Sequence, residues 1–256
     1  MSLKTKFIDV TADNITKYPQ AICFINPKHE YFHLKIEWIK EQYKNGLKIK
    51  LLFKEGHDKP VGFIEYIPGE NCWRSVDARG YMFIHCLWTY GKKHQHKGLG
   101  RILIEAVEKD AKNMYGVAVL TSDKSFMANK KLFIKNGYRI VSRSDTEQLL
   151  VKQFKNKALP SFNNYAAKLK KYKGLTIVYS KQCPWVVRFI EEIKPVVKKE
   201  KLDLWVIELK TAIQAQHTPS PYSVFNLIYN GRLLADRYIS ITRFKNILKK
   251  ENKISH

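Results

Sequence analysis

The chain of 256 residues has few cysteines and no long apolar run. No apolar stretch approaches the ~18 residues that a membrane-spanning helix needs, and the first six residues lack the apolar core of a secretory signal. We therefore expect a cytoplasmic protein with no membrane partner. The four cysteines are scattered and form no CxxC pair. This excludes a disulfide framework and a cysteine-rich zinc site, so we expect free thiols and no metal.

Acidic residues are also scarce, with 23 Asp and Glu against 46 Lys and Arg, which gives a formal net charge of +23. A strong positive field attracts polyanions. The lysines, however, occur singly and in pairs over every segment, with only short concentrations such as 168–173, and no recognised nucleic-acid motif accompanies them. We expect no specific nucleic-acid partner, although the field favours an anionic cofactor.

Hydrophobic residues make up 45% of the chain, and five Trp, fourteen Tyr and thirteen Phe are spread along it. This composition predicts a globular protein rather than a disordered one. At roughly 150 residues per domain, the length allows one ordinary domain and a smaller second one. A polar stretch with proline at 157–164 has linker character and predicts domains at 1–156 and 165–256.

The apolar spacing predicts both strands and helices in the first domain, which makes the chain an α/β (α+β) protein. The expected strands lie at 7–10, 47–53, 60–67, 81–90, 117–121, 138–141 and 148–154. The expected helices lie between 11 and 24 and at 31–43, 101–112 and 125–136. The strand at 81–90 is almost entirely apolar, so we expect it to be buried on both faces.

A glycine-containing loop at 95–100 follows this buried strand and leads into the helix at 101–112. Glycines let a backbone approach an anion closely, and the N–H groups at a helix start point at it. Lys97 and Arg101 add positive charge. Such a loop also occurs in dinucleotide-binding domains, but there it belongs to the first βαβ unit, whereas here several strands precede it. The loop therefore predicts a pyrophosphate site of another kind.

The loop and a second motif at 132–138 resemble the GNAT superfamily of N-acetyltransferases, with the similarity covering about residues 5–155 in the same order. The resemblance implies a mixed sheet, splayed near its middle and with helices on both faces, and acetyl-CoA as cofactor. The implied backbone contacts to pantetheine come from Cys86, Leu87 and Trp88. The implied pyrophosphate contacts come from Gln95, His96, Lys97, Gly98, Leu99, Gly100 and Arg101.

The resemblance further implies direct attack of a neutral primary amine on the thioester, with a backbone N–H near Trp88 stabilising the oxyanion. A base must take the amine proton, because a free alkylammonium has a pKa near ~10. The candidates are His85 on the cofactor strand, and Glu65 or Glu70 on either side of Pro68-Gly69, where the strand expected at 60–67 ends. A core histidine and solvated carboxylates are the alternative interpretations of these three residues.

Phe133 stands where many members of the superfamily have a tyrosine that protonates the leaving thiolate. A proton donor at this position is therefore excluded, although a thiolate with a pKa of about 8.5 can leave without full protonation. The acceptor amine is a small molecule or a peptide of unknown identity. Trp73, Arg74 and Cys183 are our candidates for its pocket, and simple packing is the alternative for the two large side chains.

The remaining segment predicts the order strand, helix, strand, hairpin, helix, at 175–179, 185–199, 202–209, 224–235 and 241–250. This order, with Cys183-Pro184 at the first helix start, resembles a thioredoxin-like fold and more closely the YoaP-like domain that follows some GNAT domains. The resemblance implies a thiolate stabilised by the helix and faced by a cis-proline, with Pro221 the nearest candidate. Val186 replaces the second cysteine of a redox pair, so no dithiol chemistry is expected.

The sequence leaves three functions open. The first is acetyl transfer from acetyl-CoA to a primary amine. The second is a non-catalytic module that binds CoA or associates with polyanions. The third is a monothiol activity centred on Cys183, for which a scaffold that shapes the acceptor site is the alternative. A homodimer is compatible with each of them.

Overall fold

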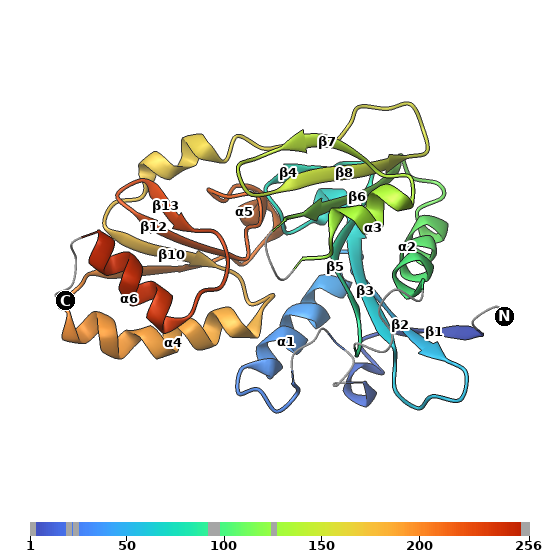
Figure 1. Ribbon diagram of the computed structural model, residues 1–256, viewed down its shortest axis with the longest axis horizontal. Helices are drawn as coiled ribbons and strands as arrows, with labels where there is room; N and C mark the ends of the chain where they lie inside the picture. The colour runs from blue at the N-terminus through green and yellow to red at the C-terminus, as the bar shows by residue number, and fades with distance from the viewer. Residues whose placement is uncertain (1–3, 19–21, 23–25, 92–97, 124–126, 252–256) are drawn as a thin grey trace. The chain divides into compact units, whose positions relative to one another are not determined.

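The computed structural model describes residues 4–18, 22, 26–91, 98–123 and 127–251 (Figure 1). The chain divides into two compact units. The first consists of Met1–Lys28, Ile39–Cys72 and Val76–Phe162. The second consists of His29–Trp38, Trp73–Ser75 and Asn163–His256. Within the described ranges no helix is long and apolar enough to cross a membrane.

The first unit contains a seven-stranded sheet in the order β1-β2-β3-β5-β6-β8-β7. Its strands are β1 (Thr5–Val10), β2 (Lys48–Lys54), β3 (Gly62–Pro68), β5 (Met82–Thr89), β6 (Gly116–Thr121), β7 (Arg139–Arg143) and β8 (Gln148–Gln153). All neighbouring strands are antiparallel except β5 and β6, which are parallel. Parallel neighbours need a crossover connection. The connection between β5 and β6 therefore carries the helix α2 (Leu99–Asp110).

The apolar face of α2 packs on this sheet. Leu103, Ile104 and Val107 are fully buried and share a core with Tyr66 and Val119 of the strands. Full burial of each such aliphatic side chain contributes about 1.5–3 kcal/mol. The shorter elements nearby are α1 (Phe32–Tyr43), whose first part belongs to the second unit, α3 (Lys130–Lys135), and the short strand pair β4 (Val76–Asp77) and β9 (Ser161–Phe162).

The second unit contains a four-stranded sheet in the order β11-β10-β12-β13. Its elements are β10 (Leu175–Tyr179), α4 (Pro184–Lys199), β11 (Leu204–Glu208), α5 (Ala212–Gln216), β12 (Phe225–Tyr229), β13 (Arg232–Ala235) and α6 (Ile241–Lys250). β10 and β11 are parallel, and the other pairs are antiparallel. Helices α4 and α6 contact each other, and Phe189 lies 5.5 Å from Phe225 and 5.7 Å from Phe244 between ring centroids in the shared core.

Most of the predicted elements are confirmed, and the tight hairpin is among them. Asn230 and Gly231 both have positive φ, +44° and +75°, as a two-residue hairpin turn requires. Two expected helices differ. Between 11 and 24 the described residues show only the 3-10 turn Ile15–Lys17. The helix expected at 125–136 is reduced to α3, because the Asn129 side chain caps it by accepting from the Lys131 N–H.

Three other differences concern short features. The expectation of a cis-proline is wrong, because no peptide bond within the described ranges is cis. The predicted linker contains β9, which pairs with β4. Helix α5 was not expected, because five residues hold too little of a helical period to show in the sequence.

Candidate active site

Strand β5 changes its pairing on both edges at His85. Toward β3, the register shifts between the pairs made by Ile84 and Cys86, so that His85 is an extra, bulged residue. Toward β6, the parallel pairs end at Ile84 opposite Val119. The sheet is therefore joined at its middle by three residue pairs only, and it opens between β5 and β6 beyond them.

The backbone groups of β5 beyond the bulge alternate between β3 and this opening. The Tyr90 N–H donates to the Val61 carbonyl at 2.8 Å, which fixes the alternation. The N–H of Trp88 accordingly points at β3, whereas those of Leu87 and Thr89 point away from β3 and into the opening. The oxyanion donor was expected near Trp88. The N–H groups that face the opening belong instead to its two neighbours, Leu87 and Thr89.

His85 and Glu65 form a buried pair at the bulge. The His85 Nδ1 and Glu65 Oε1 atoms lie 3.4 Å apart, with side-chain exposures of 0% and 1%. Burial, together with the Glu65 carboxylate, raises the pKa of Tyr43 on α1. The third candidate base, Glu70, is exposed on the 3-10 turn Gly69–Asn71. The structure thus brings two of the three predicted bases together where the sheet opens.

The start of α2 has the backbone freedom that an anion site needs. Gly98 caps the helix with a φ of +76°, and a Cβ at this position would meet no atom within 4 Å. A Cβ on Gly100 would lie 3.1 Å from the Leu132 side chain, so α2 and α3 pack closely here. The first N–H groups of a helix have no partner inside it, and they carry partial positive charge. This end of α2 is therefore open to an anion.

A pocket of about 870 Å³ connects the end of β5 with the start of α2. Its lining consists of Leu87, Trp88, Thr89, Gly98, Leu99, Gly100, Arg101, Glu105, Glu108, Ala128, Asn129, Leu132, Lys135, Asn136 and Lys152. Of the predicted cofactor contacts, this lining includes Leu87, Trp88, Gly98, Leu99, Gly100 and Arg101, but not Cys86. Gln95, His96 and Lys97 lie outside the described residues.

Sequence reasoning missed the far wall of the pocket. There the Lys152 Nζ lies 2.7 Å from the Glu108 Oε2, and Lys135 adds a second positive charge. The motif at 132–138 contains Lys135 and could have indicated that this residue lies near the cofactor site. Lys152 had no such signal, because only the order β6-β8 brings its strand next to the pocket.

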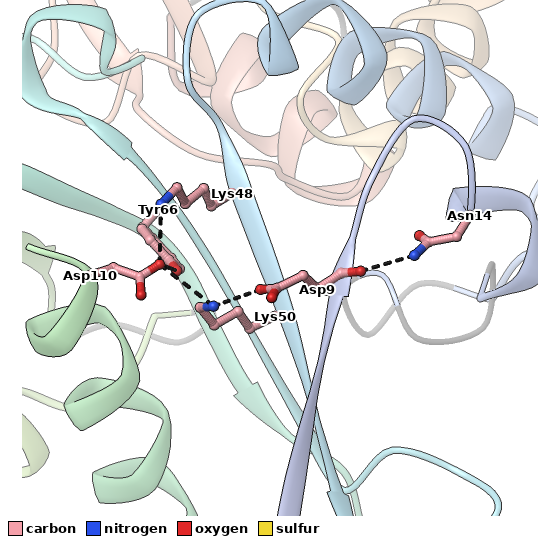
Figure 2. Close-up of polar contacts among 6 residues, drawn as sticks. All are labelled: Asp9, Asn14, Lys48, Lys50, Tyr66 and Asp110. Atoms are coloured by element: carbon pink, nitrogen blue, oxygen red, sulfur yellow. Dashed lines mark hydrogen bonds and ion pairs between the residues drawn. The ribbon is translucent and has the colours of Figure 1, made fainter.

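The other end of α2 is tied to the sheet by the polar network in Figure 2. The Tyr66 hydroxyl donates to the Asp110 Oδ2 at 2.6 Å, and Lys48 and Lys50 lie 3.3 and 3.5 Å from the same oxygen. Lys50 also contacts Asp9 on β1 at 2.6 Å. Burial raises the pKa of the Asp110 carboxyl, but the Tyr66 hydrogen bond and the two lysines outweigh it, and the net pKa is lowered. The network stabilises an anion at a helix C-terminus, where the helix dipole alone would disfavour it.

A comparison with protein families identifies this architecture. Residues 14–138 match the model of the Acetyltransferase (GNAT) family. This part of the chain is a GNAT acetyltransferase domain.

The chain is also similar to single proteins. It is 27% identical over 252 residues to YoaP of Bacillus subtilis (strain 168), an uncharacterised N-acetyltransferase, with 94% of this chain and 98% of the relative covered. A GNAT-family acetyltransferase structure from Staphylococcus aureus Mu50 is 19% identical, with a TM-score of 0.45, and covers 59% of this chain and 100% of that one. The paia N-acetyltransferase of Thermoplasma acidophilum, in complex with coenzyme A, is 14% identical, with a TM-score of 0.40 and coverages of 59% and 100%.

The three residues predicted for an acceptor pocket belong to the second compact unit, although Trp73 and Arg74 also lie within the matched residues 14–138. Trp73 is buried, with its ring 5.3 Å from that of Trp38. The buried Arg74 donates to the Gln182 Oε1 at 2.8 Å. Cys183, partly buried, is the N-cap of α4. Packing thus accounts for the burial of the first two, and an acceptor role for all three stays a prediction. Within the described ranges, no three His, Cys, Asp or Glu side chains are grouped as metal ligands.

Proposed function

We propose that the chain transfers an acetyl group from acetyl-CoA directly to a primary amine. The observation that carries this proposal is the pocket of about 870 Å³, which joins the opening of the sheet to the start of α2. Its volume lies within the range of about 300–1,000 Å³ that is usual for ligand sites. Membership of residues 14–138 in the Acetyltransferase (GNAT) family supports the reaction class.

The pyrophosphate of acetyl-CoA would lie at the first turn of α2, on the N–H groups of Leu99, Gly100 and Arg101. Gly98 lets the chain turn into the helix without a side chain above the anion. Gln95, His96 and Lys97 precede this turn and complete the proposed site. The pantetheine would then run along β5 at Leu87 and Trp88 toward the bulge, with Cys86 at the inner end.

In the proposed reaction the amine nitrogen attacks the thioester carbonyl carbon, and the carbonyl oxygen becomes an oxyanion. The Leu87 N–H is the donor for this oxygen, because it points into the opening and Leu87 lines the pocket. When the C–S bond breaks, the coenzyme leaves as a thiolate. Phe133 is fully buried and offers no proton to it, and a thiolate with a pKa of about 8.5 does not require one.

The proton of the attacking amine would go to the Glu65 and His85 pair. His85 directly follows the last β5–β6 pair at Ile84, and Glu65 of β3 lies beside it, although neither residue belongs to the pocket lining. Because the pair is buried, we propose that one water molecule carries the proton to it, which is a usual arrangement for a general base. Glu70 is the less suitable candidate, since it lies on an exposed turn beyond β3.

Calorimetric titration with acetyl-CoA, followed by thiol release across a panel of small-molecule and peptide amines, tests the proposal. We expect binding of the coenzyme and release of thiol with at least one amine. Binding without turnover across the panel would favour the non-catalytic CoA-binding module. Retention on DNA that weakens with salt, in a protein without coenzyme affinity, would favour the polyanion-associated module.

We further propose that residues 165–256, which form most of the second unit, are a thioredoxin-like domain of the YoaP-like kind, with a linker at 157–164 and the GNAT domain at 1–156. The sheet order β11-β10-β12-β13, with parallel β10 and β11 joined through α4, supports this proposal. The trans peptide bond before Pro221 is a departure from that fold.

A monothiol activity remains the second candidate for this domain, because Cys183 is the N-cap of the 16-residue helix α4. Replacement of Cys183 by serine separates the roles. If acetyl transfer survives unchanged, the domain positions the acceptor or is structural. If acetyl transfer is lost with the fold intact, the thiol takes part. A cytoplasmic location and the absence of a specific nucleic-acid partner belong to the same proposal.

A further inference from the structure

Strand β11 is an exposed apolar edge of the sheet in the second unit. It lies at the end of the order β11-β10-β12-β13 and has a neighbouring strand on one side only. Three consecutive residues in its middle, Trp205, Val206 and Ile207, are 65%, 43% and 43% exposed. Proteins usually protect sheet edges with charges, proline or bulges. None of these interrupts the segment Leu204–Ile207, so the edge is suited to receive another strand.

The backbone groups of β11 fix what that strand has to match. The Leu209 N–H donates to the Tyr179 carbonyl of β10 at 2.7 Å. Because N–H and C=O groups alternate along a strand, every second residue before Leu209 faces β10 as well. The groups of Leu204, Val206 and Glu208 therefore point outward, to the open edge.

We propose that β11 pairs antiparallel with β11 of a second copy of this chain, about a two-fold axis at Val206. In this register Leu204 lies opposite Glu208 of the second copy, and Val206 lies opposite Val206. All three outward-pointing residues then meet outward-pointing residues, as antiparallel hydrogen-bonded pairs require. The strand thus forms an isologous interface with itself, as two-fold dimers do.

The alternative registers match less of the edge. A shift by one residue places outward groups against residues whose polar groups face β10. A shift by two residues places Leu204 or Glu208 opposite residues beyond the end of β11. The proposed register also places Trp205 opposite Ile207 of the second copy, twice, on one face of the joined sheet. Aromatic and β-branched residues are favourable cross-strand pairs.

The net charge of the chain gives this association a distinctive dependence on salt. Two copies that each carry a formal charge of +23 repel each other at long range. Salt screens this repulsion, since the Debye length falls from about 30 Å at 0.01 M to about 10 Å at 0.1 M. Dimerisation should therefore strengthen as salt is added, whereas binding of a polyanion should weaken.

Sedimentation of the full chain over a range of concentrations, at low and moderate salt, tests the proposal. We expect a monomer–dimer equilibrium that salt shifts toward the dimer. Val206→Pro removes an N–H that points to the open edge and none that bonds to β10. The dissociation constant of the dimer should therefore rise at least tenfold in this variant, while its thermal midpoint stays close to that of the wild type. Ile207→Lys should have the same effect, because it sets a charge opposite Trp205.

The matched control is Ile213→Lys on α5, which alters an apolar side chain that is 69% exposed but outside β11 and should leave the equilibrium unchanged. Trp205 fluorescence should shift to shorter wavelength as the dimer forms, and Trp205→Phe should remove that shift. A chain that stays monomeric at every concentration would overturn the proposal. So would a dimer that neither Val206→Pro nor Ile207→Lys weakens, including one held by contacts elsewhere.

Discussion

The buried Glu65 and His85 pair is the feature on which the proposed chemistry depends most at the scale of single residues. Glu65→Gln keeps the size of the side chain but takes away its charge. We expect kcat to fall by about 10²–10⁴-fold, the usual contribution of a general base, with acetyl-CoA affinity unchanged by calorimetry. Glu70→Gln, on the exposed turn, is the matched control and should retain activity. Equal rates for the two variants would remove the pair from the mechanism.

Two glycines allow a matched test of the proposed phosphate site. Gly98 at α2 and Gly56 between β2 and β3 have φ values of +76° and +75°, and a Cβ at either would meet no atom within 4 Å. Alanine in this conformation costs about 1–2 kcal/mol at both positions. We expect Gly98→Ala and Gly56→Ala to lower the free energy of unfolding alike, measured by denaturant titration.

Only the variant at the proposed phosphate site should also raise the dissociation constant of acetyl-CoA. Gly98→Ala reorients the N–H groups that would hold the pyrophosphate, whereas the turn at Gly56 lies outside the pocket lining. If both variants bind acetyl-CoA like the wild type, the start of α2 does not hold the phosphates.

The sequence predicted the residues of the candidate site better than their relations to one another. Glu65 and His85 were alternatives in the sequence, and they become a pair because β5 bulges against β3. A bulge is defined by the partner strand, so the residues of β5 alone do not reveal it. Trp73 and Arg74 suggested a binding surface, but the structure buries both, and aromatic and long side chains commonly pack in this way.

At the scale of elements, the network around Asp110 holds α2 on the sheet and so sets the position of its other end. The folded state lowers the pKa of Asp110, so this carboxylate stabilises the protein above the ordinary aspartate pKa of about 3.9. That stability is lost as pH falls through the lowered pKa. We expect the thermal midpoint of the wild type to drop more steeply below about pH 4 than that of Asp110→Asn. Parallel midpoint curves for the two proteins would contradict this account.

The long elements were predictable because their periods are clear. Helices α2, α4 and α6 have one apolar face each, and the strands of the first sheet are short apolar runs between turns. The pair β4 and β9 has only two residues in each strand, which is too little for any pattern to show. The strand order was beyond the sequence without the resemblance, because hydrophobic patterning does not say which strands are neighbours.

At the scale of the whole molecule, the formal charge of +23 should speed the capture of an anionic coenzyme. We expect the association rate constant of acetyl-CoA, measured by stopped flow, to fall several-fold as salt shortens the Debye length from about 30 Å toward about 8 Å. The neutral thioester S-acetylpantetheine is the matched control and should show no such dependence. The same slope for both ligands would mean that the field plays no part in binding.

The opening between β5 and β6 has a consequence for the exchange of amide hydrogens with solvent. Amides of Leu87 and Thr89 face this opening, whereas β6 itself is bonded along its full length to β8. In deuterium oxide, Leu87 and Thr89 should take up label sooner than Val117, Val119 and the other residues of β6. If the opening is where an acyl coenzyme settles, these two positions should show the largest protection on adding it, and they would report occupancy without any knowledge of the acceptor.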